Sequence, residues 1–399
     1  MTLTNAHLAE LLALAAEDAE GHRLKALRRA SRLAFLWPLE AADLLAAGRS
    51  LTDLAGIGPW LARVLRAWFE DPPYIPDPPA LRRDFLTLAE ARRILAQAPD
   101  TYGGLRGDLQ MHSDWSDGSG TILEMAAAGV EHGYGYVGIT DHSKGLKIAG
   151  GIDEAELREQ EREVERVNRE LSERGLGLRV LRSLEMNLSP EGASDMEPAA
   201  LARLDLVLGS FHSQLRKTDD QTGRYLAALR NPDIQVLGHP RGRVYDFRLG
   251  LSADWRRVFG TAAELDKAVE IDAFPDRQDL NVELLDAARE AEVRISIGTD
   301  AHHPWQLGHV DLGLAAAVRA GIPRDRILNF MEADELVAWA ERVRSRGRER
   351  RITAAGSGDG TDLREGMGDS AGQAKEAKGK RRGRKPRKAG QGNGGGGGI

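Results

Sequence analysis

The sequence predicts an α/β barrel that is preceded by a small all-α unit and followed by a disordered tail. Between about residues 105 and 345, short apolar runs alternate with amphipathic helical stretches, as in parallel strands joined by helices. The first 70 residues are rich in alanine and leucine and read as helices. From Thr353 onward the chain has no aromatic residue and 15 glycines, a composition that buries too little apolar surface to fold.

The boundary between the two folded units is marked by proline. Residues 71–79 contain five of the 16 prolines, and proline cannot continue a helix because it lacks the backbone donor. We therefore expect a stiff linker with one short helix at about 80–98. The predicted division is a helical unit at 1–70, a linker at 71–104, a barrel at 105–345 and a tail at 353–399.

Composition limits the chemistry of the 399 residues. The chain has no cysteine, which excludes disulfides, thiolate nucleophiles and iron–sulfur clusters, so any metal must be held by His, Asp, Glu or an amide. No apolar run approaches the ~20 residues that span a bilayer, and no signal peptide is evident. We expect a cytoplasmic protein with no membrane association and no obligate protein partner.

The net charge of −6 is unevenly distributed. Residues 375–388 hold nine basic residues and one acidic residue, which contributes +8 and leaves −14 for the rest of the chain. The stretch 380–388 resembles an AT-hook, whose Arg-Gly-Arg core enters a narrow minor groove, although Lys385 separates that core from Pro386. The alternative is a solubilising tail with salt-sensitive affinity for nucleic acid.

Polar residues follow the candidate strands of the barrel. The seven strands are expected to end near His112, His142, Glu185, His212, His239, Asp272 and Asp300. A single histidine at a strand end is usually structural, but the carboxyl ends of parallel barrel strands converge on one face. Five histidines with Asp117, Glu185 and Asp300 at one mouth predict bound divalent metals, because the carboxylates would otherwise repel each other.

Several ordered motifs resemble the PHP (polymerase and histidinol phosphatase) domain. They are the stretches 107–118, 140–151, 239–243, 270–273 and 298–302, with Asn281. The likeness is greatest to the PHP domain that ends bacterial family X DNA polymerases, and it covers roughly residues 105–345. It implies a distorted seven-stranded barrel with three divalent metal ions, of manganese or zinc, with iron as a further candidate.

The resemblance also implies a ligand set. The first metal would be surrounded by Gln110, His112, Glu185 and Asp300, the second by Glu185, His212 and His239, and the third by Asp117, His142 and His302. Gln110 stands where the family usually has histidine, and its amide oxygen would weaken the first site or favour manganese over zinc. Asp272 stands where we expect asparagine.

Bound ions would acidify a water, orient the phosphate and stabilise the leaving oxygen. On this basis Glu185, Asp300 and His212 are the expected catalytic residues. Three cations that follow ligand positions within four residues are candidates to clamp the phosphate, namely Arg241, Arg243 and Lys144. The alternative for these three is solvent-exposed charge.

The turn at 54–59 resembles a helix-hairpin-helix motif. Gly56, Ile57 and Gly58 would let the backbone approach a DNA phosphate, which the next helix's amides would receive. The alternative is an ordinary helix–helix turn. The first 70 residues resemble the N-terminal domain of family X polymerases, but about 35 residues before the barrel leave no room for a nucleotidyltransferase domain, so polymerase activity is not expected. Arg63 and Arg66 stand where lyase-competent relatives carry lysine.

Three functions are consistent with these features. The first is a metal-dependent phosphoesterase that acts on DNA, as a 3′–5′ exonuclease or 3′-end-processing enzyme in repair, with DNA held by the helical unit and the basic tail. The second is a small-molecule phosphatase of the histidinol-phosphatase type. The third is a non-catalytic DNA-binding protein with a decayed metal site, which Gln110 alone supports.

Overall fold

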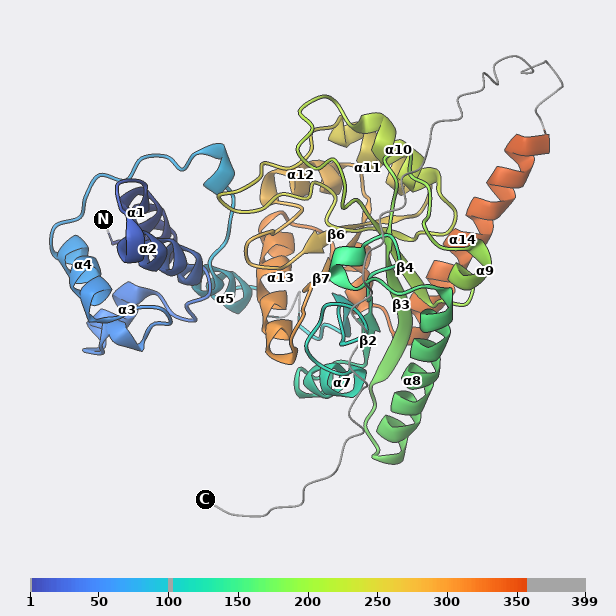
Figure 1. Ribbon diagram of the computed structural model, residues 1–399, viewed down its shortest axis with the longest axis horizontal. Coiled ribbons are helices and arrows are strands. Elements are labelled where there is room, and N and C mark those ends of the chain that lie inside the picture. The colour runs from blue at the N-terminus through green and yellow to red at the C-terminus, as the bar shows by residue number, and fades with distance from the viewer. Residues whose placement is uncertain (1, 100–102, 357–399) are drawn as a thin grey trace, which may run out of the picture. The chain divides into compact units, whose positions relative to one another are not determined.

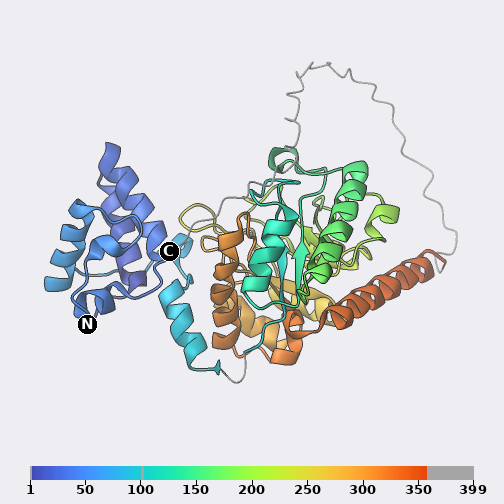
Figure 2. The same cartoon turned by 90° about the horizontal axis from the view of Figure 1, so that it is seen from below.

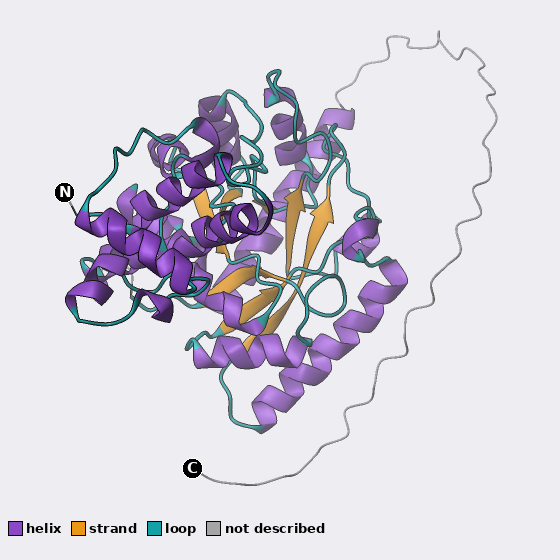
Figure 3. Ribbon diagram, turned by 60° about the vertical axis from the view of Figure 1, so that its left-hand side comes forward, coloured by secondary structure: helices purple, strands orange, loops and turns teal. Residues whose placement is uncertain are grey.

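The computed structural model describes residues 2–99 and 103–356. Its centre is one sheet of seven parallel strands that pair in chain order. Figure 3 draws the strands in orange. The strands are β1 (Gly107–Met111), β2 (Tyr136–Ile139), β3 (Arg179–Asn187), β4 (Leu206–Ser210), β5 (Val236–Leu237), β6 (Ala268–Asp272) and β7 (Arg294–Gly298). The predicted strands and their parallel pairing are confirmed.

Polar contacts between the first and last strands nearly close this sheet into a barrel. Met111 and Ala301 form a parallel bridge, and the backbone N–H of His112 donates to the carbonyl of Ala301 at 2.8 Å. The hydroxyl of Thr299, just after β7, donates to the buried carboxylate of Asp108 on β1 at 2.5 Å. The predicted barrel is therefore present, and its first and last strand ends lie side by side.

Helices surround the strands (Figure 1). They are α7 (Ile122–Glu131), α8 (Glu154–Glu173), α9 (Pro198–Leu201), α10 (Thr222–Arg230), α11 (Trp255–Glu264), α12 (Val282–Glu290), α13 (Val310–Arg319) and α14 (Ala333–Gly356). The highly charged α8 illustrates the pattern, because it buries Leu157, Val164, Val167 and Leu171 on one face at helical spacing. Among the described residues, no helix is both long and apolar enough to cross a lipid bilayer.

The N-terminal unit is helical, as predicted. It contains α1 (Asn5–Glu17), α2 (Gly21–Ala34), α3 (Ala41–Ala46), the short 3-10 helix η1 (Leu51–Asp53) and α4 (Pro59–Glu70). A linker follows, with a 3-10 turn η2 (Ala80–Arg82) and then α5 (Leu88–Ala96). This helix is shorter than the stretch predicted at 80–98, because the side chain of Thr87 accepts from the N–H of Glu90 and caps its start. Helix α5 packs along α13 (Figure 2).

The helical unit shares its hydrophobic core with one residue of the barrel. Tyr245, in the segment after β5, is 3% exposed, and its ring lies 4.8 Å from Phe35 and 5.2 Å from Phe85. Arg82 adds an ion-pair network, since its guanidinium contacts Glu10 at 2.9 Å and Asp246 at 3.1 Å. The helical unit, linker and barrel belong to one compact unit, Met1–Ala355.

Helix α14 extends to Gly356, slightly beyond residue 353, where the sequence predicted the disordered tail to begin. The basic stretch predicted as a minor-groove hook lies outside the described residues.

Candidate metal centre

Glu185 lies at the centre of the histidine cluster. Its carboxylate is fully buried, and Oε1 lies 2.6 Å from Nε2 of His239 and 3.0 Å from Nε2 of His212. Its other oxygen, Oε2, lies 3.3 Å from Nδ1 of His142 and 3.4 Å from Nε2 of His112. One carboxylate therefore faces two groups of imidazoles, as the predicted bridging role requires.

A second group of ligand atoms surrounds Asp117. Its Oδ1 lies 3.3 Å from Nε2 of His302, 3.6 Å from Nε2 of His142 and 3.8 Å from Nδ1 of His112. The His112 ring stacks between those of His142 and His302, each with a centroid distance of 4.4 Å. The loop after β1 thus carries Asp117 back over the ends of β2 and β7.

Asp300 completes a third group with His112 and Glu185. Its Oδ1 lies 2.9 Å from Nε2 of His112. The backbone of Asp300 has a φ of 52° and that of His239 a φ of 22°, a region that non-glycine residues rarely occupy and that often occurs at functional sites. Both strand ends therefore adopt an uncommon backbone where a ligand is predicted.

Neighbouring polar groups fix the orientation of these rings. Nδ1 of His212 lies 3.1 Å from Oδ1 of Asn187, and Nδ1 of His302 lies 2.7 Å from the carbonyl of Asp300. Such contacts select the imidazole nitrogen that is presented to a metal. In both histidines Nε2 faces a predicted ligand carboxylate.

Gln110 and Asp272, the two departures from the family pattern, adjoin this cluster. The amide orientation of Gln110 that suits its neighbours turns the nitrogen toward Glu270, with distances of 2.6 and 3.0 Å to the two carboxylate oxygens. Asp272 is fully buried, and its Oδ2 lies 3.8 Å from Nε of Arg277. Metal binding by Gln110 stays a prediction.

The buried carboxylates create a strongly negative field. Burial lowers the pKa of His112, but its hydrogen bond to Asp300 and the charges of Asp300 and Glu185 outweigh this and raise it to about 9. Burial raises the pKa of both Glu270 and Asp272, and the neighbouring carboxylates raise it further. A divalent cation would neutralise this field.

The cluster passes three tests as a divalent metal site. Its ligand atoms form three groups in which all atoms lie within 4.8 Å of one another: His112, Asp117, His142 and His302; His142, Glu185 and His212; and His112, Glu185 and Asp300. Nδ1 of each of His112, His142 and His239 is buried without a hydrogen-bond partner among the described residues. Imidazole and carboxylate together suit zinc, manganese or iron. These groups contain seven of the eight predicted His, Asp and Glu ligands, and they fit divalent metals. In the group with Glu185 and His212 the third member is His142 and not the predicted His239, which contacts Glu185 at 2.6 Å.

The three predicted phosphate-binding cations lie in different environments. Arg243 is 5% exposed, lies 3.8 Å over the ring of Phe85 and donates to the carbonyls of Arg83 and Asp84. This placement favours a role in holding the linker against the barrel over the predicted phosphate contact. Arg241 is half-buried and donates to Asn281 and to the carbonyl of Leu249. Lys144 is half-exposed and pairs with Glu154 at 2.6 Å.

Sequence reasoning missed Arg277. Its guanidinium Nη2 lies 3.3 Å from Oδ2 of Asp300, and its side chain is 30% exposed, so solvent reaches it. Burial lowers the pKa of Arg277, but the charges of Asp300 and Asp272 outweigh this and raise it. The sequence did contain a signal for Arg277, because it follows Asp272, at the end of β6, by five residues. Arg243 was selected on a similar spacing, four residues after His239.

The predicted hairpin positions lie at the start of α4. Gly56 has a φ of 79°, a conformation that favours glycine, and an added Cβ would also displace the end of the Leu33 side chain. The side chain of Ile57 is buried in the helical core, whereas Gly58 is exposed and precedes the first turn of α4. Any DNA contact here would involve the backbone, and it stays a prediction.

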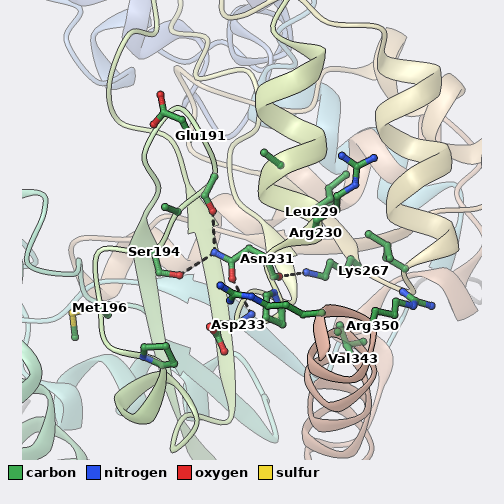
Figure 4. Close-up of a pocket in the computed structure, with 18 residues that line it drawn as sticks. Glu191, Ser194, Met196, Leu229, Arg230, Asn231, Asp233, Lys267, Val343 and Arg350 are labelled. Carbon is green, nitrogen blue, oxygen red and sulfur yellow. Dashed lines mark hydrogen bonds between the residues drawn. The ribbon is translucent and has the colours of Figure 1, made fainter. Parts of the chain in front are cut away.

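A pocket of about 710 Å³ lies beside α10, α14 and the segment that joins β3 to α9 (Figure 4). Lys267 and Asp233 border it just before β6 and β5, whereas the ligands follow the carboxyl ends. Lys267 donates to the carbonyl of Asn231 at 2.5 Å, and burial lowers its pKa to about 7. This pocket is separate from the metal centre.

Comparison with known proteins relates the barrel to phosphoesterases. The chain is 35% identical over 241 residues to the DNA polymerase/3′-5′ exonuclease PolX of Bacillus subtilis, a match that covers 60% of this chain and 42% of that protein. It is 29% identical over 170 residues to a probable phosphatase of Thermoanaerobacter sp., covering 40% of this chain and 67% of the relative. A probable phosphatase of Caldanaerobacter subterraneus is 22% identical over 231 residues, a match that covers 57% of this chain and 87% of the relative.

Among solved structures, the chain matches histidinol phosphate phosphatase from Lactococcus lactis, in complex with zinc, L-histidinol and phosphate, with 16% identity and a TM-score of 0.38. The match covers 54% of this chain and 94% of that one. No protein-family model matches. The ordered motifs, the seven-stranded barrel and the sequence relatives together support a PHP-domain phosphoesterase, of the class that hydrolyses phosphoric esters.

Proposed function

We propose that the chain is a metal-dependent DNA phosphoesterase that trims 3′ ends, as a 3′–5′ exonuclease or a 3′-end-processing enzyme in repair. The observation that carries this proposal is the docking of the helical unit. Tyr245 and Arg82 join that unit to the loop after β5, the same loop that begins with the ligand His239. DNA held by the helical unit would therefore lie close to the metal centre.

Basic residues of α2 support a nucleic-acid substrate. Arg23, Lys25, Arg28, Arg29 and Arg32 are all exposed on this helix. Arg32 also borders a pocket whose other wall includes Phe274 and Trp305, from the loops that follow β6 and β7. A row of cations that leads toward the cluster would contact successive phosphates of a strand.

Within the site, each side chain has a defined task. Divalent ions held by the eight His, Asp and Glu side chains would supply Lewis-acid activation of water and stabilisation of phosphoryl charge. Arg277, which lies against Asp300 and is partly exposed, would hold a non-bridging phosphate oxygen. Asn187 and the carbonyl of Asp300 would keep His212 and His302 in their ligating orientation.

The test is manganese-dependent digestion of 3′-labelled single-stranded and duplex oligonucleotides. A His212→Ala/Asp300→Ala double variant should lose digestion, whereas His132→Ala, at the exposed histidine that caps the C-terminus of α7, should not. Equal digestion by the wild type and the double variant would overturn the proposal.

A small-molecule phosphatase is the second candidate, because several sequence relatives are named as probable phosphatases. Deleting the helical unit would expose the buried rings of Tyr245 and Phe85 and could unfold the barrel. Substitutions of exposed arginines therefore separate the two candidate functions better than a deletion. Arg28→Ala/Arg32→Ala should weaken oligonucleotide turnover and spare a small phosphomonoester. The matched control is Arg158→Ala/Arg169→Ala, at exposed arginines of α8. Equal effects on both substrates would favour the small-molecule function.

A further inference from the structure

An apolar pocket of about 150 Å³ lies between the helical unit and the barrel. Leu33, Phe35 and Leu36, from the end of α2 and the residues after it, form one wall, and Tyr245, Phe274 and Trp305 contribute to the other. The walls are therefore mostly aliphatic and aromatic. Polar groups border them at Arg32, Asp276, Gln306 and His309.

The barrel wall of this pocket is continuous with the metal centre. The ring of Phe274 lies edge-on to that of the ligand His302, at a centroid distance of 6.4 Å. The side-chain oxygen of Gln306 accepts from the N–H of His302 at 2.7 Å. Arg277, one residue beyond Asp276, contacts Asp300. A group in the pocket would thus lie beside a phosphate at the metals.

Trp305 presents an aromatic surface at this position. It is 61% exposed, although its ring contacts those of His309 at 5.5 Å and His303 at 5.9 Å. The two histidines support the indole without covering it. Exposed aromatic rings beside cations are the usual platform for unstacked bases in single-stranded nucleic acid, because every base has a π-face.

We propose that this pocket holds the unstacked terminal nucleobase of the DNA strand whose phosphodiester lies at the metal centre. The inference rests on the proposed function and specifies its substrate as an unpaired end. Pockets for whole drug-sized ligands begin at about 300 Å³, so this smaller pocket suits a single ring system. Arg32, at its border, would neutralise the adjoining phosphate. A paired terminal base would have to leave its duplex to enter.

Binding is tested first, without hydrolysis. Oligonucleotides that carry the fluorescent base 2-aminopurine at the 3′ terminus or at an internal position, with a phosphorothioate terminal linkage, are titrated with the manganese-loaded protein. We expect strong quenching of the terminal probe only. Trp305→Ala should weaken binding of the terminal probe roughly 10-fold to 100-fold, which is about 1.4–2.8 kcal/mol at 1.4 kcal/mol per tenfold. Trp305→Phe should retain most of the binding, and Tyr74→Ala, at an 87% exposed linker aromatic, should match the wild type.

Hydrolysis separates the pocket from the proposed function. Two single-stranded substrates differ only in whether the terminal nucleotide carries adenine or is abasic, and we expect KM to be roughly 10-fold to 100-fold higher for the abasic end. Trp305→Ala should bring the ratio of the two KM values close to one. If the wild type cleaves both ends with equal KM, or quenches both probes equally, the pocket assignment is wrong and exonuclease activity stands. If terminal quenching depends on Trp305 but no oligonucleotide is cleaved, the pocket stands and the proposed function fails.

Discussion

Replacement of Tyr245 by alanine should detach the helical unit from the barrel. Burying a large aromatic side chain removes about 150–250 Å² from water, which at about 25 cal/mol per Å² corresponds to roughly 4–6 kcal/mol as an upper bound. Measured losses for aromatic-to-alanine changes in cores are about 3–5 kcal/mol. Because Tyr245 is 3% exposed and contacts both Phe35 and Phe85, we expect Tyr245→Ala to cost about 3–5 kcal/mol.

Tyr245→Phe is the matched control, since it keeps the ring and removes the hydroxyl. That hydroxyl lies 3.3 Å from Oγ of Ser31, so its loss should cost about 1 kcal/mol. The assay is urea denaturation followed by circular dichroism, together with limited proteolysis of the linker at 71–79. Tyr245 does not hold the helical unit on the barrel if the alanine and phenylalanine variants share one unfolding midpoint and one proteolysis rate.

Three further predictions concern the metal centre and the separate pocket. Arg277→Met should lower kcat/KM on oligonucleotides at least tenfold, with a metal content that elemental analysis finds unchanged. Arg277→Lys should recover part of the lost kcat/KM. A proportional fall in bound metal would instead show that Arg277 positions the metal ligands. Gln110→His should bind manganese or zinc about tenfold more tightly in chelator competition, because imidazole is a better metal ligand than an amide. An unchanged affinity would show that residue 110 does not coordinate the metal. Burial lowers the pKa of Lys267 from its ordinary value of 10.5 to about 7. Between pH 7 and 10.5 the unfolded chain therefore holds a proton on Lys267 that the folded chain lacks. The free energy of unfolding should rise with pH across this range, by at most about 5 kcal/mol. Denaturation midpoints across that range should show this slope in the wild type and lose it in Lys267→Met; an equal slope in both would exclude Lys267 as its source.

The strands and most of the ligand cluster could be predicted because their signals are local. An apolar run that ends in Gly-Ile-Thr-Asp-His or Gly-Thr-Asp-Ala-His shows both where a strand stops and which side chain follows it. Parallel topology then brings the ends together without further information. The grouping of His142 and His302 around Asp117 therefore follows from the fold, although the distances between them do not.

The roles of Arg243 and Arg277 could not be separated from the sequence. Each follows a strand end by five or six residues, and each lies in a loop without periodic pattern. Only tertiary contacts place Arg243 over the ring of Phe85, in the linker, and Arg277 against Asp300. The docking of Tyr245 was missed for the same reason, since an aromatic residue in a loop has no local signal for the core it joins.

Two loops of the barrel couple the helical unit to the metal centre. The loop after β5 begins with His239, beside Glu185, and carries Tyr245 into the helical core. The loop after β6 places Arg277 on Asp300, while its next residue, Gln278, exchanges hydrogen bonds with the backbone of Leu86 in the linker. A shift of the helical unit would pull on both loops, and each loop contains a group at the metal centre. We therefore expect a displacement of the helical unit to change the positions of the two loops that carry His239 and Arg277.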